Sequence, residues 1–369
     1  MNPANDHTKH LVLMITYECN LRCTYCYEHH LPGRKMSVEL ALKTIRKTFD
    51  DISKDDWYER LEIIFMGGEP LKEWQTIKQI VEHIEACRDL PLPYHFFAAT
   101  NGTLLTEDKR NWIEQRKDHF ILGISVDGND YMQTKNRGKM SKDIDLSYFL
   151  NTWPNQPPKT TISPYTISNL AQGIIYLHKV GFRKINANLA FGQEWEHSAL
   201  RVYSEQLDIL ADFYLEHPEI ERCSLLNLNL LAALNVKGEN RKFCGCGEMM
   251  ACIDVDGTEY ACQMFAPITL GEKRAKDTLG IDFNNHEVFV NDKCSQCIFN
   301  ILCPRCYGMS YKQTGDVRWR EPFLCSAFKI QLIANCKLAE RMMQRNLYVE
   351  DADTISEIIK YIKYNLLKQ

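Results

Sequence analysis

The sequence predicts a mixed α/β protein in which a parallel sheet covered by helices precedes a smaller, cysteine-rich domain. Strand-like and helix-like segments alternate over residues 1–225. Six such repeats imply parallel strands joined by helical crossovers, in an open sheet or a partial barrel. Over residues 226–369 glycine, cysteine and short strand-like pieces dominate, followed by helices. With 45% hydrophobic and 25% charged residues among 369, the chain has the composition of a globular protein with a sizeable core.

The first part of the chain is expected to hold six strands, each a short apolar or β-branched run. Ser37 precedes apolar residues at helical spacing and is expected to cap a helix. Further helices are expected at about residues 73–87 and 107–116, and Ser168 could cap another before the sixth strand. The expected strands are residues 11–16, 61–65, 94–100, 120–126, 160–163 and 184–189. In such folds the active site lies at the carboxyl ends of the strands, so the loops there are expected to carry the chemistry.

The second part is expected to contain one β-hairpin and two closing helices. Residues 253–260 alternate in the manner of a hairpin, with Asp256-Gly257 at the turn. Two long helical patterns, at about residues 328–346 and 353–367, end the chain.

The charge balance gives no electrostatic case for binding nucleic acid or an anionic membrane. Against 48 acidic residues there are 44 basic ones, for a formal net charge of -4. The first residues lack the basic and apolar stretches of a signal peptide, and no run of 18 apolar residues exists. We therefore expect a cytoplasmic protein whose 15 cysteines stay reduced. In that compartment, clustered cysteines indicate metal or redox chemistry.

Three cysteines stand in the loop after the first strand, at the spacing C-x3-C-x2-C. Cys19, Cys23 and Cys26 can hold three irons of a [4Fe–4S] cube and leave the fourth iron without a protein ligand. An open iron can bind a small molecule, which indicates catalysis. The alternative is a zinc site that takes its fourth ligand from a distant histidine or cysteine.

This loop, with Tyr25 before its last cysteine, resembles the C-x3-C-x-aromatic-C signature of the radical S-adenosylmethionine (radical SAM) enzymes. The resemblance implies a partial (β/α)6 TIM-like barrel. It also implies that the open iron is chelated by the amino and carboxylate groups of SAM. Reductive cleavage of SAM then gives methionine and a 5′-deoxyadenosyl radical, which takes a hydrogen atom from the substrate.

The loops after the next three strands resemble further motifs of that family. The resemblance implies that the first motif, GGEP, holds the amino group of SAM, since its glycines allow close backbone approach and Glu69 can pair with an ammonium group. It implies that Ser125 contacts the ribose and that Arg137 lies on the SAM carboxylate. A plain turn remains the alternative for GGEP, and a solvated loop residue the alternative for Arg137. The implied cofactor-binding residues are Tyr25, Gly67, Gly68, Glu69, Pro70, Thr100, Asn101, Ser125, Asp127 and Arg137.

The C-terminal cysteines resemble the SPASM extension of radical SAM enzymes, which binds two auxiliary [4Fe–4S] clusters. The resemblance assigns Cys294, Cys297, Cys303 and Cys325 to the second auxiliary cluster. It assigns Cys262 and Cys306 to the first auxiliary cluster, together with one or two ligands from Cys244, Cys246 and Cys252. The last pair, Cys303 and Cys306, has two intervening residues where the family has three. If only three cysteines bind the first auxiliary cluster, it has an open iron.

Structural zinc is the alternative for these cysteines, because C-x2-C occurs twice. The five residues between the two pairs are too few for a zinc ribbon, and the number of thiols exceeds one tetrahedral site. Cys87, Cys223 and Cys336 have no cysteine neighbours in sequence and are expected to be incidental thiols.

The resemblance implies an enzyme that modifies a ribosomally made precursor peptide, forming a crosslink or another modification while an auxiliary cluster takes up an electron. Sulfatase maturation to formylglycine ranks second, because relatives place a basic aspartate where this chain has Gln263, and an amide cannot take up a proton usefully. A non-catalytic iron–sulfur or zinc sensor or scaffold ranks third.

The resemblance also implies partners. These are a precursor peptide or protein, and an external electron donor such as flavodoxin or ferredoxin. Only 18 residues precede Cys19, so we expect either recognition of the precursor by the barrel and SPASM surfaces or a separate leader-binding protein.

Overall fold

The computed structural model describes residues 7–235, 242–300 and 302–366. Its central feature is a six-stranded sheet in the order β4-β3-β2-β1-β7-β8, beside a two-stranded sheet of β5 and β6. The strands are β1 Thr8–Thr16, β2 Arg60–Gly67, β3 Tyr94–Thr100, β4 Phe120–Ile124, β5 Lys159–Ile162, β6 Asn186–Leu189, β7 Met250–Ile253 and β8 Glu259–Tyr260.

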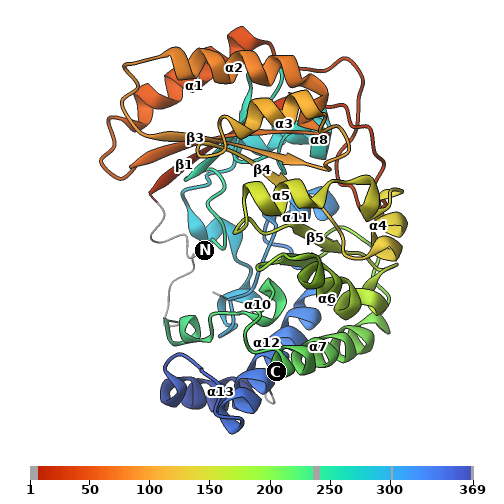
Figure 1. Cartoon of the computed structure of the whole chain (residues 1–369). Coiled ribbons are helices and arrows are strands. Elements are labelled where there is room, and N and C mark those ends of the chain that lie inside the picture. Colours follow the sequence, from red (N-terminus) through yellow and green to blue (C-terminus); the bar gives the residue numbers. More distant parts are fainter. Residues whose placement is uncertain (1–6, 236–241, 301, 367–369) are drawn as a thin grey trace.

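The first six strands form a parallel arc rather than two separate sheets. Neighbours β1 to β4 pair in parallel, and β5 pairs in parallel with β6. One parallel bridge between Ser125 and Lys159 joins the end of β4 to β5, and the Val126 N–H donates to the Lys159 carbonyl at 3.0 Å. The result is a partial barrel, and it confirms the expected fold class (Figure 1).

The hairpin β7–β8 completes the other edge of this arc. Strand β7 pairs in parallel with β1 and antiparallel with β8. Gly257, with φ at +89°, lies in the turn, where a residue without Cβ adopts positive φ at little cost. The hairpin itself was predicted; its place in the barrel sheet was not.

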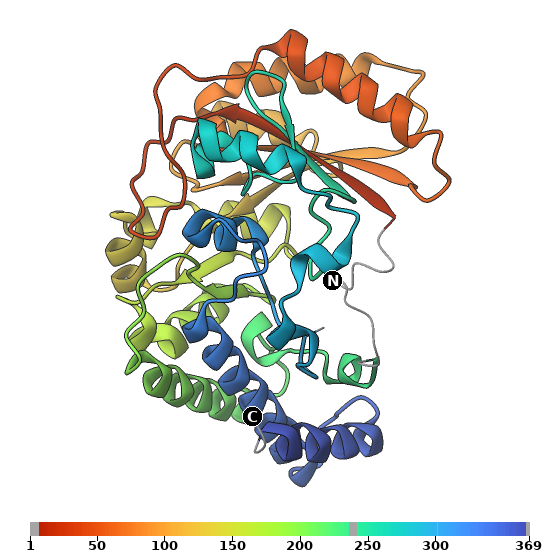
Figure 2. The same cartoon turned by 180° about the vertical axis from the view of Figure 1, so that it is seen from behind.

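The α-helices pack on the outside of the arc and around the C-terminal segment (Figures 1 and 2). Helices α1, α2 and α3 lie on the outer side of β1 to β4, and α12 lies along α7. The helices are α1 Val38–Ile52, α2 Trp74–Ala86, α3 Glu107–Glu114, α4 Asp130–Arg137, α5 Leu146–Thr152, α6 Leu170–Val180, α7 Ala199–Glu216, α8 Pro267–Leu270, α9 Glu272–Asp277, α10 Asp292–Ser295, α11 Tyr307–Thr314, α12 Pro322–Gln344 and α13 Ala352–Leu366. Short 3₁₀ turns are η2 Pro70–Glu73, η3 Ser141–Asp143, η4 Ile167–Asn169, η5 Ser224–Leu226, η6 Leu230–Asn235, η7 Thr278–Gly280 and η8 His286–Phe289.

Alternation along β1 explains how the C-terminal segment is held. Leu11 and Leu13 pack in the large core beneath the outer helices, together with Ile45 of α1. Val12 and Met14 point to the opposite face and pack with C-terminal residues that include Phe265 and Tyr307. One face of the arc is therefore covered by helices, and the other by the cysteine-rich part of the chain.

The expected elements are confirmed with two differences. The Ser37 side chain accepts from the Leu40 N–H and caps α1, as predicted. The predicted cap at Ser168 is wrong. A 3₁₀ turn precedes α6, Asn169 takes the cap position, and the Ser168 hydroxyl bonds to the Asn169 side chain instead. The helix predicted from residue 328 begins at Pro322, because proline fits the first helical position.

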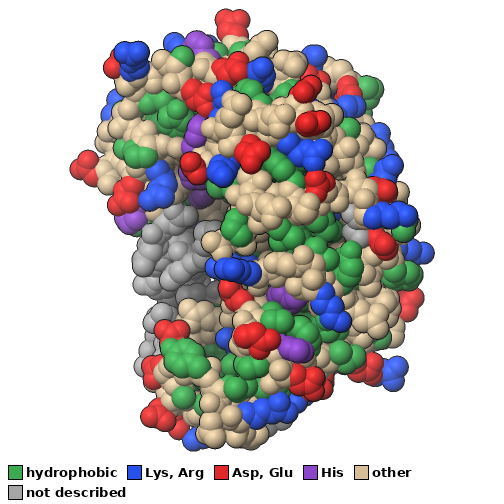
Figure 3. Space-filling model, viewed as in Figure 1, with side chains coloured by type: hydrophobic (Ala, Val, Ile, Leu, Met, Phe, Trp, Pro, Cys, Tyr) green, Lys and Arg blue, Asp and Glu red, His purple; other side chains and the backbone are tan. Residues whose placement is uncertain are grey.

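The boundary at residues 225 and 226 stays a prediction. None of the helices in the described ranges has the length and apolar character that a membrane crossing requires. On the face shown in Figure 3, acidic and basic side chains are interspersed.

Candidate functional site

The first cysteine loop leaves the carboxyl end of β1, as expected. Cys19 and Cys23 are half-buried and Cys26 is exposed. Burial raises the pKa of Cys19 to about 11, and Glu69 and the Cys23 thiol add to this shift. Three thiols in one loop at the carboxyl end of β1 can hold three irons of a [4Fe–4S] cube.

The glycines of the GGEP loop are required by close backbone contact with this cysteine loop. A Cβ on Gly67, whose φ is +142°, would lie 2.0 Å from the Thr16 carbonyl oxygen. A Cβ on Gly68 would lie 2.4 Å from the Glu18 carbonyl oxygen and 2.8 Å from the Cys19 nitrogen. The Glu69 N–H donates to the Glu18 carbonyl at 2.8 Å. The GGEP loop and the start of the cysteine loop are thus held as one unit, which a plain turn does not require.

We expect Gly68→Ala to lower both stability and iron content. Its methyl group would displace the backbone at Glu18 and Cys19, and overpacking of this kind costs about 1–3 kcal/mol. Chemical denaturation and iron analysis of the reconstituted protein measure the two effects. Gly280→Ala is the matched control, since its Cβ meets open space. Equal iron content in both variants would contradict the expectation.

Glu69 joins the GGEP loop, residues 67–70, to the Thr100-Asn101-Gly102 loop (the TNG loop) from a fully buried position. Its carboxylate accepts from the Leu71 N–H at 3.2 Å, the Thr100 hydroxyl at 2.8 Å and the Asn101 N–H at 2.8 Å. Burial raises the pKa of Glu69, and these three donors oppose that rise. Because a carboxylate has about four acceptor positions, one is left for a further donor such as an ammonium group. Pro70 begins the turn η2 directly after it.

Asp127 is a second buried carboxylate, and it gathers groups from the cysteine loop, helix α4 and strand β5. It accepts from the Tyr25 hydroxyl at 2.6 Å, from Arg137 Nε at 2.9 Å and from Arg137 Nη2 at 3.1 Å. It also accepts from the Thr161 N–H at 2.9 Å and from the Asn136 side-chain amide at 3.2 Å. Five donors on two oxygens leave it little capacity for a ligand. We therefore expect Asp127 to act by positioning Tyr25 and Arg137.

Arg137 is a buried residue at the end of α4. The alternative prediction, that it is a solvated loop residue, is wrong. Its side chain is 8% exposed, and its guanidinium carbon lies 5.6 Å from the centre of the Tyr25 ring. Burial alone would lower the pKa of Arg137, but Asp127 and other neighbours raise it, so the cation persists. Its charge also opposes the rise that burial causes in the pKa of Cys23.

The remaining residues at this edge complete one continuous site. The Asn101 side chain donates to Asn20 of the cysteine loop at 3.0 Å. Ser125 is half-buried one residue beyond β4, and in the described part of the chain its hydroxyl has no hydrogen-bond partner. The structure therefore brings all the predicted motif loops to the carboxyl ends of β1 to β4. Sequence reasoning missed Asn20 and Asn136, and their single polar side chains carry no motif that would have identified them.

The opening C-terminal cysteines separate into two kinds. The Cys246 thiol donates to Cys244, which lowers the pKa of Cys244, and Lys242 adds to this shift. Cys244 adds to the rise that burial causes in the pKa of both Cys262 and Cys306, and Cys306 adds to the rise for Cys262. By contrast, Cys252 lies within β7 opposite Val12 and is fully buried. Cys244, Cys246, Cys262 and Cys306 thus form a group, and Cys252, although part of the sheet, packs in the same buried cluster as Cys246 and Cys262.

The second C-terminal set gathers near α10 and α12. Burial raises the pKa of Cys303 to about 11, and Cys325 and Cys297 contribute to the rise. Cys294 lies in the short helix α10, and Cys325 lies in the first turn of α12. Arg320 Nη2 donates to the Cys303 sulfur at 3.0 Å. The three remaining cysteines, Cys87, Cys223 and Cys336, stay predicted as incidental thiols.

One group of closely spaced ligand atoms bears on the zinc alternative. Cys26, Glu28 and His30 have ligand atoms within 4.8 Å of one another, and His30 Nε2 lies 3.4 Å from the Cys26 sulfur. This group uses only one of the three motif cysteines. Zinc bound there would leave Cys19, Cys23 and the three motif loops without a role.

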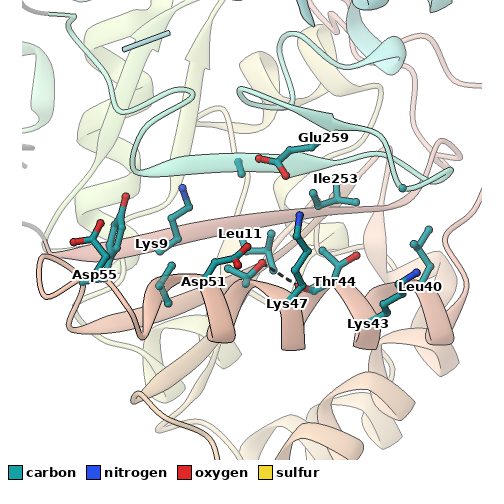
Figure 4. A pocket seen from close by; sticks show the side chains of 15 residues that line it. Lys9, Leu11, Leu40, Lys43, Thr44, Lys47, Asp51, Asp55, Ile253 and Glu259 are labelled. Atoms are coloured by element: carbon teal, nitrogen blue, oxygen red, sulfur yellow. Dashed lines mark hydrogen bonds between the residues drawn. The ribbon is translucent and has the colours of Figure 1, made fainter. Parts of the chain in front are cut away.

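A cavity of about 430 Å³ lies elsewhere, between α1 and the hairpin (Figure 4). Its lining includes Lys9 and Leu11 of β1, Lys47 of α1 and Glu259 of β8. It contains none of the motif residues.

Comparison with known proteins identifies the family to which this chain is similar. Residues 13–145 match the Radical SAM superfamily. The chain is 29% identical to an uncharacterized protein of Methanocaldococcus jannaschii, over 58% of this chain and 73% of that protein. It is 26% identical to the radical SAM cyclopropyl synthase TigE of Paramaledivibacter caminithermalis and 24% identical to a cysteine-type anaerobic sulfatase-maturating enzyme of Clostridium novyi. These two matches cover 36% and 34% of this chain, and 30% and 34% of those proteins.

Two solved structures share the fold over most of the chain. The enzyme anSMEcpe with bound AdoMet superposes with a TM-score of 0.67 at 18% identity, covering 95% of this chain and 98% of that one. SuiB of Streptococcus suis bound to its precursor peptide SuiA superposes with a TM-score of 0.55 at 17% identity, covering 86% of this chain and 76% of that one.

Proposed function

Because this chain carries a radical SAM domain, we propose that it is a radical SAM peptide maturase that abstracts a hydrogen atom from a residue of a ribosomally made precursor peptide. The observation that carries the proposal is the pair of buried carboxylates, Glu69 and Asp127. They join every motif loop to the cysteine loop at one end of the barrel. A sensor or scaffold would have no need of such a site.

The residues of this site fit a [4Fe–4S] cluster and SAM. Cys19, Cys23 and Cys26 would ligate three irons, and the remaining acceptor position of Glu69 suits the amino group of SAM. Arg137, with Tyr25, would meet the carboxylate, and Ser125 would meet the ribose. When bound, the cluster and SAM supply the 5′-deoxyadenosyl radical. The chain itself orients SAM, holds the peptide and excludes water.

The C-terminal cysteines are proposed to hold two auxiliary clusters. Cys244, Cys246, Cys262 and Cys306 would give the first cluster four protein ligands, with Cys252 left in the sheet. Cys294, Cys297, Cys303 and Cys325 would hold the second. Iron analysis distinguishes these clusters from zinc sites, because three [4Fe–4S] cubes require about 12 irons per chain.

Peptide substrates are supported by the solved relatives. One anSMEcpe structure contains the Kp18Cys peptide, and one SuiB structure contains SuiA. For this chain we propose a precursor peptide substrate, a flavodoxin or ferredoxin as electron donor, a separate leader-binding protein as a partner and a cytoplasmic location.

Formylglycine formation is the second candidate, since the anSMEcpe fold matches this chain with a TM-score of 0.67. Against it stands Gln263, whose Oε1 is buried without a hydrogen-bond partner among the described residues. An amide cannot serve as the base.

The test is anaerobic incubation of the reconstituted protein with SAM, dithionite and a candidate peptide, followed by mass spectrometry. Production of 5′-deoxyadenosine with loss of two hydrogens from the peptide indicates a crosslink. Formylglycine in a sulfatase peptide would favour the second candidate. Protein that binds only zinc, or that leaves SAM intact, would contradict both.

A further inference from the structure

Two arginines lie against the second C-terminal cysteine set, and no motif predicted them. Arg320 donates from Nη2 to the Cys303 sulfur at 3.0 Å and from Nη1 to the Pro304 carbonyl at 2.7 Å. Arg305, only 8% exposed, donates from Nη2 to the Asn300 carbonyl at 2.9 Å. Both guanidinium charges oppose the rise that burial causes in the pKa of Cys303.

Each of these arginines also has a donor without an acceptor. The Nε atoms of Arg305 and Arg320 are buried and have no hydrogen-bond partner among the described residues. Buried N–H groups are nearly always paired in folded proteins. Arg320 contacts Cys303 and Arg305 follows it by two residues, so these two unpaired donors indicate an acceptor near this cysteine set. The sulfide and thiolate sulfurs of an iron–sulfur cluster are such acceptors, so the donors fit the proposed cluster.

One carboxylate lies next to Arg320 in the sequence. Glu321 follows Arg320, and its Oε2 is buried without a partner. Arg320 opposes the rise that burial causes in the pKa of Glu321. Two guanidinium groups against one carboxylate still leave a net positive environment, and only the arginines donate hydrogen bonds.

We propose that Arg320 and Arg305 raise the reduction potential of the cluster held by Cys294, Cys297, Cys303 and Cys325. The proposal rests on the proposed function, which places a cluster there. Reduction adds one negative charge to a cluster, and hydrogen bonds to its sulfurs together with nearby cations stabilise that charge. The site at Cys19, Cys23 and Cys26 differs, because its buried arginine, Arg137, is already paired with Asp127. The raised potential makes the second auxiliary cluster a good acceptor of electrons.

The experiment is a potentiometric titration of the reconstituted protein, followed by electron paramagnetic resonance of the reduced clusters. Replacing Cys19, Cys23 and Cys26 by alanine removes the resonance signal of the cluster proposed at the barrel end and so simplifies the spectrum. In this background, Arg320→Gln, Arg320→Lys and Arg305→Gln are compared. Arg318→Gln is the matched control, because Arg318 is an exposed arginine two residues away that pairs with Asp316.

We expect Arg320→Gln to lower the ratio of reduced to oxidised cluster about tenfold at the parent midpoint potential, which corresponds to ~59 mV for a one-electron couple. Arg305→Gln should shift the ratio in the same direction, Arg320→Lys should shift it less than Arg320→Gln, and Arg318→Gln should leave it unchanged. If the Arg320→Gln protein does not bind the cluster, the ratio of reduced to oxidised cluster is measured in Arg320→Lys and Arg305→Gln instead. Both variants should still show a lower ratio than the parent protein.

Potentials in the Arg320 and Arg305 variants that equal that of Arg318→Gln would overturn the inference and leave the proposed function intact. An intact wild-type chain that binds only about 8 irons, unchanged by Cys297→Ala, would instead show that no cluster is held there. In that case the auxiliary-cluster part of the proposed function fails together with the inference.

Discussion

Replacing Cys19, Cys23 and Cys26 by alanine is expected to abolish SAM cleavage and to remove about 4 of 12 irons per chain. The three thiols are the only cysteines between residues 1 and 86. Their loop is attached to the GGEP loop through the backbone. The C-terminal cysteines lie on other elements and should keep their iron. The measurements are iron analysis and chromatographic detection of 5′-deoxyadenosine after anaerobic reduction with dithionite.

Cys87→Ala is the matched control for this variant. Cys87 is half-buried at the end of α2, and its thiol donates to the His83 carbonyl at 3.3 Å. It should retain all the iron and all the activity. Loss of every iron in the triple variant would mean that the cysteine sets are not independent. Retained SAM cleavage would mean that the site lies elsewhere.

Asp127→Asn is expected to destabilise the protein by about 3–5 kcal/mol and to weaken SAM binding. Asp127 is fully buried and accepts from both nitrogens of the Arg137 fork. Removing its charge leaves a buried cation without a partner, which is among the costliest substitutions in a folded protein. An asparagine would also turn an NH₂ group toward one of the five donors that Asp127 accepts. Denaturant unfolding and equilibrium binding of SAM measure the two effects.

Asp212→Asn is the control, because Asp212 forms an exposed ion pair with Arg341 that should contribute at most about 1 kcal/mol. The double variant Asp127→Asn with Arg137→Met separates stability from binding. It removes the unpaired cation and should recover part of the stability, but it should not recover SAM binding. Full recovery of binding would show that Arg137 does not contact SAM.

Much of the fold was predictable because its signals are local. The cap at Ser37 depends on a residue three positions away, and the alternating faces of β1 follow from the two-residue period of a strand. The hairpin turn was predictable because Gly257 adopts a positive φ, which glycine does at little cost. The Ser168 cap failed because a 3₁₀ turn competes with the first turn of α6, and local propensity does not decide between them.

By itself, the sequence determined the six strands of the arc, the hairpin and the cysteine spacings that indicate iron–sulfur chemistry. These depend on residues close together in the chain. The tertiary structure decided that β7 joins β1, and that Asp127 holds Tyr25 from 102 residues away. It also decided that Arg320 donates to Cys303. These contacts form only when the chain has closed long loops, and the free energy that favours them comes from burial and charge pairing in the folded state.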